Sequence, residues 1–100
     1  YNAANSTVAK SKYISIAQKL CLTSETSDAS VQLAALVKCV QSLARQVGCS
    51  MTMKEIGIDN ITFKNSFSIL VQQAIADRTY GGNPYEATKE DLTRILTCII

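Results

Sequence analysis

The feature that most constrains this sequence is the spacing of its apolar residues, which recur at three- and four-residue steps in four stretches. No stretch shows the sustained two-residue alternation of a half-buried strand. The periodicity therefore predicts an all-α chain whose helices bury one face each. The clearest stripe comprises Leu33, Leu36, Val40, Leu43 and Val47. The other stripes comprise Ala9, Tyr13, Ile16, Ala17 and Leu20; Phe63, Phe67, Leu70, Val71 and Ala74; and Leu92, Ile95, Leu96 and Ile99.

Capping residues and helix breakers divide the chain into four main helices and one short one. Gly48 is placed to end the second helix, and Thr52 and Gly57 to begin and end a single turn. Thr88 and Asp91 have the spacing of a capping box. A chain of 100 residues is short for more than one ordinary domain, so the helices predict a single helical bundle. The main helices are expected over residues 5–21, 28–47 and 62–78, and from Thr88 onward.

The sequence lacks histidine, and its four cysteines form no Cys-x-x-Cys pair, which argues against several kinds of site. A tetrahedral zinc centre needs four suitable ligands brought together. Nucleophilic catalysis by a Ser-His or Cys-His pair needs a histidine base. The acidic residues Glu25, Asp28, Glu90 and Asp91 lie in a capping loop or a predicted first helical turn, where the helix dipole favours a carboxylate. We therefore expect no complete catalytic or metal site in this chain.

Cysteine usage and charge suggest the compartment and the partners. Cys21 and Cys39 fall within apolar runs, where a thiol acts as a small hydrophobic group, so we expect a reducing compartment, the cytoplasm. The even cysteine count leaves a small secreted bundle with two disulfides as an alternative. The net charge of +2 is too small to favour nucleic acid. No apolar run approaches the roughly 18 residues of a membrane span, so neither nucleic acid nor membrane is an expected partner.

The loop that follows the third helix is the one place where a direct part in function is expected. Two glycines and a proline within residues 81–84 cannot hold a helix, and the glycines permit positive φ or close backbone approach. The third glycine and the Lys-Ser/Thr pair of phosphate-binding loops are missing. A plain surface turn is the alternative to a cleft wall. The candidate cleft-lining residues are Thr79, Tyr80, Gly81, Gly82 and Asn83.

The stretch from Ala76 to Leu92 resembles the C-terminal signature of iron-containing (group III) alcohol dehydrogenases. It is most similar to their lactaldehyde reductase and propanediol dehydrogenase branch. The most specific element is Asn83-Pro84 followed by Thr88 and Asp91. Further similar pieces occur in the family's order at residues 1–2, 16–20, 43–48 and 53–58. The sequence departs from the family pattern at Cys21, where the family often has Gly, at Thr79, where it often has Cys, and at Tyr85, where it usually has Arg.

The resemblance implies that this chain is the C-terminal part of the all-helical domain of a two-domain oxidoreductase. Such an enzyme interconverts alcohols and aldehydes or ketones by metal-assisted hydride transfer with NAD or NADP. The metal is usually iron or zinc, and its ligands, one Asp and three His, lie upstream of the Tyr-Asn motif that here is Tyr1-Asn2. The resemblance therefore implies no catalytic, cofactor-binding or metal-binding residue in this chain. The chain would be scaffold and cleft wall, inactive alone. Its partners would be an N-terminal cofactor domain and further copies in a homo-oligomer.

A reading from a different class is a free-standing helical module that binds a protein partner without catalysis. It explains the amphipathic stripes equally well, but not the ordered pieces of family sequence.

Overall fold

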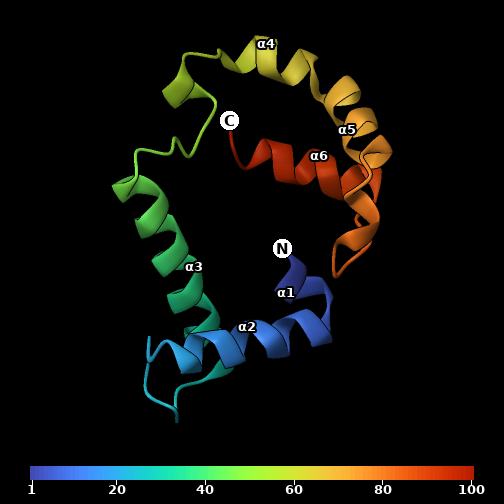
Figure 1. Ribbon diagram of the computed structural model, residues 1–100. Helices are drawn as coiled ribbons and strands as arrows, with labels where there is room; N and C mark the ends of the chain where they lie inside the picture. The colour runs from blue at the N-terminus through green and yellow to red at the C-terminus, as the bar shows by residue number, and fades with distance from the viewer. The chain divides into compact units, whose positions relative to one another are not determined.

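The computed structural model describes residues 1–100 and contains helices and connecting segments only, which confirms the all-α class (Figure 1). The chain divides into two compact units, Tyr1–Gly48 and Cys49–Ile100. None of the helices combines the length and the apolar composition that a bilayer span demands. The helices are α1 (Asn2–Asn5), α2 (Thr7–Lys19), α3 (Ala29–Gln46), η1 (Lys54–Ile56), α4 (Asn60–Asn65), α5 (Phe67–Ala76), η2 (Tyr80–Gly82) and α6 (Lys89–Thr97), where η marks a 3-10 turn.

In the first unit, α2 packs against both α1 and α3, and its buried face consists of small side chains. Ala9 and Ala17 are 2% and 0% exposed, and small residues at a contact let two helices approach closely. On α3, Gln32 is buried, and its Nε2 donates to the carbonyl of Ser27 at 2.7 Å. The expected α2 stripe is therefore only partly right, because Ile16 and Leu20 are exposed.

The apolar stripe of α3 is covered over only part of its length. Leu33 and Leu36 are half-buried, whereas Val40, Leu43 and Val47 are 58%, 59% and 68% exposed. The expectation that the whole stripe is buried is wrong for its C-terminal half. Helix α3 has 18 residues and α2 has 13, so α3 is longer by about 8 Å at 1.5 Å per residue. Figure 1 shows the C-terminal half of α3 leading away from α2.

Helix α2 ends in a Schellman motif whose left-handed residue is a cysteine. The N–H of Cys21 donates to the carbonyl of Gln18 at 2.9 Å, and the N–H of Leu22 donates to that of Ala17 at 3.1 Å. Cys21 has φ of 50°, the only positive value at a residue other than glycine. All four cysteines are exposed free thiols, so the expectation that Cys21 and Cys39 pack as small hydrophobic groups is wrong.

In the second unit, the helix expected over residues 62–78 is two elements, α4 and α5. Helix α4 begins at Asn60, two residues before the expected start at residue 62. Asp59 caps it, because its Oδ1 accepts from the N–H groups of Ile61 and Thr62 at 3.0 Å each. At the break, the Ser66 hydroxyl donates to the carbonyl of Thr62 at 3.0 Å, a bond that tends to bend helices.

Contacts on either side of that break hold the second unit together. Phe63 is buried and meets Phe67 edge to face, with ring centroids 5.0 Å apart. Helix α5 packs against α6, and the N–H of Met53 donates to the carbonyl of Ile99 at 2.8 Å. The short turn expected near residue 54 is confirmed as η1, which ends at Gly57 with φ of 84°.

Replacing Cys21 by Gly should raise the free energy of unfolding by about 1 kcal/mol. A left-handed backbone brings Cβ close to a carbonyl oxygen, which costs a residue such as cysteine roughly 1–2 kcal/mol. Glycine removes this cost, but its greater freedom in the unfolded chain offsets part of the stability gained. Urea denaturation measures the change.

Gly48→Ala is the matched control, because Gly48 follows α3 with φ of 79° and a Cβ there would meet no atom within 4 Å. It should lose about as much stability as Cys21→Gly gains. A destabilised control beside an unchanged Cys21→Gly would mean that Cys21 carries no conformational strain.

Candidate functional site

The five candidate cleft residues stand together in the connection between α5 and α6. Three of them, Tyr80 to Gly82, form the 3-10 turn η2. The expectation that the glycine pair rules out helical structure is therefore wrong for this one turn. The turn closes through the N–H of Gly82, which donates to the carbonyl of Thr79 at 3.0 Å. Neither Gly81 nor Gly82 has positive φ, and a Cβ at either would meet no atom within 4 Å. Neither backbone conformation nor packing in this chain therefore demands glycine at these two positions.

Thr79 fixes the exit of the chain from α5. Its N–H donates to Oδ1 of Asp77 at 2.7 Å, and its hydroxyl donates to the same oxygen. These bonds, that of the hydroxyl first, lower the pKa of the Asp77 carboxyl below its ordinary value. Thr79 remains exposed, and its hydroxyl oxygen can still accept a hydrogen bond.

Tyr80 closes the loop on itself. Its ring is half-buried, and its hydroxyl donates to the carbonyl of Ala87, a buried residue. Asn83 Nδ2 donates to the carbonyl of Tyr85 inside the span that this bond closes. The side chain of Tyr80 therefore serves first to hold the two ends of the loop together.

Asp91 organises the far end of the loop from the first turn of α6. Its Oδ2 accepts from the N–H of Thr88 at 3.0 Å, and its own N–H donates to Oγ1 of Thr88 at 3.2 Å, which confirms the predicted capping box. Its Oδ1 lies 4.0 Å from the exposed guanidinium of Arg94, a pair that contributes little in water.

The same carboxylate reaches Tyr85, which sequence reasoning did not connect to it. The Tyr85 hydroxyl donates to Oδ2 of Asp91 at 3.3 Å. The negative charge of Asp91, followed by partial burial, raises the pKa of the Tyr85 phenol above 10.0. Helical periodicity carries no signal for this contact, because Tyr85 precedes the helix.

The residues of this chain do not fit a divalent metal. Nowhere in the chain do three or more His, Cys, Asp or Glu side chains come together in a way that could hold an ion. The loop instead presents an exposed hydroxyl, backbone amides and open space above two glycines. Such a surface can line a cleft and donate or accept hydrogen bonds.

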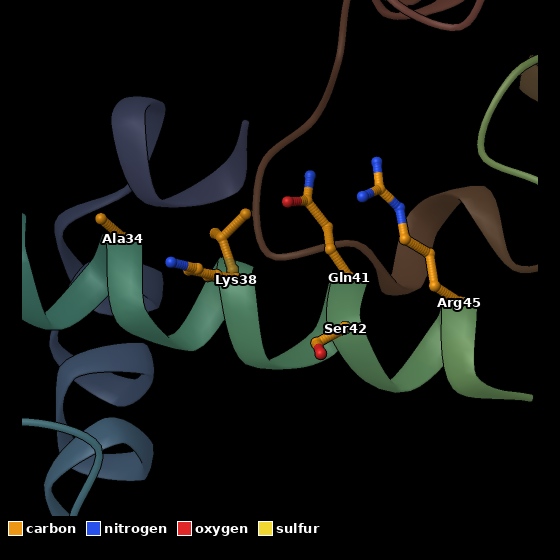
Figure 2. A pocket seen from close by; sticks show the side chains of 6 residues that line it. Ala34, Lys38, Gln41, Ser42 and Arg45 are labelled. Atoms are coloured by element: carbon orange, nitrogen blue, oxygen red, sulfur yellow. The ribbon is translucent and has the colours of Figure 1, made fainter.

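A hollow of about 590 Å³ in the first unit does not add a site. Figure 2 shows Gln41 and Arg45 projecting from the same side of α3 beside it. A hollow lined by a single helix has no second element to enclose a ligand, and here it has no acid–base pair. Its lining residues are Ala34, Val37, Lys38, Gln41, Ser42 and Arg45.

Asp91→Asn should return the pKa of Tyr85 toward its ordinary value, because the amide oxygen can still accept from Thr88 but carries no charge. A raised folded-state pKa means that the folded chain keeps the phenol proton where the unfolded chain has lost it. Stability should therefore fall as pH rises from about 10 through the folded-state pKa, and this fall should weaken in Asp91→Asn. Absorbance titration of the tyrosines measures the pKa, and Tyr85→Phe identifies the signal. The same titration curve in Asp91→Asn and the unaltered protein would contradict the assignment.

Comparison with known proteins relates this chain to one family. The Fe-containing alcohol dehydrogenase family, C-terminal, matches residues 1–100. The chain is 30% identical over 95 residues, 95% of its length, to a protein from Clostridium saccharobutylicum named NADPH-dependent butanol dehydrogenase. The matched region is 24% of that relative, so the chain spans about a quarter of the relative's length. The periodic helices, the capped loop before α6 and the match over all 100 residues together lead to one conclusion: the chain belongs to the Fe-containing alcohol dehydrogenase family and corresponds to its C-terminal region.

Proposed function

We propose that the whole protein is an oxidoreductase that interconverts alcohols and aldehydes or ketones with NAD or NADP, and that these 100 residues are its scaffold and one cleft wall. The observation that carries this proposal is the family match over all 100 residues. Because the chain lacks histidine and any cluster of metal ligands, residues outside it would hold the metal. The nicotinamide would be bound by the N-terminal cofactor domain that the family resemblance implies. The bound metal would polarise the substrate oxygen as a Lewis acid.

The geometry of the loop from Thr79 to Asn83 supports its part as a cleft wall. Its beginning is held by Asp77, and its end by the bond from Tyr80 to Ala87. Between these points, Gly81 and Gly82 leave open space that no residue of this chain fills. A loop with fixed ends and no Cβ in the middle allows a ligand to approach the backbone closely.

For the substrate, we propose short vicinal diols and the corresponding hydroxyaldehydes, as in the lactaldehyde reductase and propanediol dehydrogenase branch that residues 76–92 resemble. The hydroxyl of Thr79 is exposed and donates to Asp77, so its oxygen is oriented with room to accept. A second hydroxyl on the substrate could donate to it, whereas butanol has no such group. Sites that bind a substrate hydroxyl discriminate against analogues that lack it.

The purified whole protein, reconstituted with iron or zinc, should reduce NAD or NADP in the presence of propane-1,2-diol, with a higher kcat/KM than for butan-1-ol. Absorbance of the reduced nicotinamide measures the rate, and a chelated sample is the control. The 100-residue chain alone should be inactive. Failure to oxidise any alcohol or reduce any aldehyde with either nicotinamide would refute the reaction, and a preference for butan-1-ol would refute only the substrate class.

Thr79→Val in the whole protein should lower the ratio of kcat/KM for propane-1,2-diol over butan-1-ol by up to about tenfold, the effect of one neutral hydrogen bond. The melting temperature should hold, because Thr79 is exposed and its backbone bond to Asp77 remains. Thr93→Val is the matched control, since the Thr93 hydroxyl is also exposed and donates locally, to the carbonyl of Lys89.

Tyr80 needs a milder substitution than alanine, because its hydroxyl and half-buried ring both stabilise the loop. Tyr80→Phe removes the hydrogen bond alone, and should lower kcat/KM for all alcohols alike by loosening the wall. Unaltered kinetics in Thr79→Val and Tyr80→Phe toward both alcohols would leave this loop as a connection between helices.

A further inference from the structure

A closed ring of hydrogen bonds runs through the loop before α6 and the first turn of that helix. Asp91 is its charged member. This residue is 8% exposed, and its Oδ2 accepts from the hydroxyl of Tyr85 at 3.3 Å and from the N–H of Thr88 at 3.0 Å. The capping box needs only the bond from Thr88, so the bond from Tyr85 joins the same oxygen to the loop. We call the ring the loop circuit; its members are Tyr80, Asn83, Tyr85, Ala87, Thr88 and Asp91.

The rest of the loop circuit passes around the glycine pair and returns to α6. The carbonyl of Tyr85 accepts from Nδ2 of Asn83, whose own N–H donates to the carbonyl of Tyr80 at 3.3 Å. The hydroxyl of Tyr80 donates to the carbonyl of Ala87, the residue before the N-cap of α6. The two glycines lie between Tyr80 and Asn83, so the circuit holds the residue on each side of them.

The loop circuit limits where the glycine pair can lie. A buried carboxylate that loses a hydrogen-bond donor carries a desolvation cost, so Asp91 retains its two donors strongly. An added Cβ at Gly81 or Gly82 would meet no atom within 4 Å, so packing does little to hold these residues. Their position therefore depends on the bonds on either side of them.

We propose that Asp91 and Tyr85 are positioning residues for the reaction, which through the loop circuit hold the backbone of the glycine pair in place as cleft wall. This inference rests on the proposed function, because it takes the loop from Thr79 to Asn83 to line the cleft. Neither side chain needs to touch the substrate. Displacing a positioned wall by a fraction of an ångström misplaces whatever binds against it, and this lowers the rate of reaction.

Hydrogen exchange in the whole protein tests whether the circuit holds the loop. Tyr85→Phe removes the bond to Asp91 and keeps the ring, so the loop should open more often. The amides of Gly82 and Asn83, which both donate within this turn, should then exchange about tenfold faster. Mass spectrometry of a peptide spanning residues 79–85 measures the rate.

Tyr13→Phe is the matched control for exchange, since Tyr13 is also half-buried and lies on α2, outside the loop circuit. It should leave exchange of the loop peptide unchanged. Equal exchange in Tyr85→Phe and the unaltered protein overturns the proposal. Faster exchange throughout the protein, rather than in this peptide, would mean general destabilisation and overturns it as well.

Kinetics of a double variant distinguish one circuit from two independent anchors. Tyr80→Phe and Tyr85→Phe each remove one hydroxyl from the loop circuit, and each should lower kcat/KM toward propane-1,2-diol and butan-1-ol alike by about tenfold. If a closed circuit positions the wall, the first break already releases it, so the double variant should also lose about tenfold. A loss of about a hundredfold in the double variant would mean independent anchors and would contradict the circuit.

Exchange needs no turnover, so this proposal and the proposed function fail separately. An unaltered protein that oxidises alcohols, with the same exchange and kinetics in Tyr85→Phe, would refute the positioning role alone. Faster exchange with unaltered kinetics would likewise refute it, because the loop would then lie away from the reaction. An inactive protein with the expected change in exchange would refute the reaction and leave the circuit as the device that holds the loop.

Discussion

Each unit of this chain depends on one long helix pair, α2 with α3 in the first and α5 with α6 in the second. A single pair can cover only the faces that the two helices turn toward each other. The fully covered positions are accordingly few, and no large side chain is completely buried. In the first unit, the buried apolar positions of α2 are the alanines Ala9 and Ala17. Much of the remaining apolar surface, above all on α3, is not covered by the helices of its own unit.

With so little core, hydrogen bonds at the helix ends define the elements. Ser6, Asp59 and Thr88 each accept from the N–H groups that begin a helix, and each therefore sets where α2, α4 and α6 start. Helices α2 and α3 are followed by residues in left-handed conformations, Cys21 and Gly48 respectively. Glycine is the least strained residue in this conformation, and the related dehydrogenases often have glycine at the position of Cys21.

The loop before α6 combines these local devices into a surface suited to a cleft. Asp77 and Asp91 receive hydrogen bonds at its two ends, and Tyr80 joins it to Ala87, so the scaffold determines where it lies. Its glycines have no conformational or packing role within the chain. The chain contributes shape and hydrogen-bonding groups, and the reactive groups that we propose for the whole protein come from elsewhere.

The sequence by itself determined the helical class, the apolar stripe of each main helix, and several of the helix ends. These depend on interactions within about four residues, so Gly48, Thr88 and Asp91 could be placed from their spacing alone. The order of short pieces ending in Asn83-Pro84 identified the family, and with it the loop that holds the candidate site. None of these inferences needed the position of a distant residue.

Only the tertiary structure decided how far each face is covered. Leu36 and Leu43 lie on the same stripe of α3, yet α2 covers one and leaves the other exposed, because coverage depends on the length and direction of the neighbouring helix. The same holds for two hydroxyl groups. Ser66 donates to the carbonyl of Thr62 and Tyr85 donates to Asp91, and the sequence alone does not say which of several nearby acceptors each hydroxyl uses. Periodicity specifies the direction of a side chain around its helix, whereas the presence of a partner at that position depends on the rest of the fold.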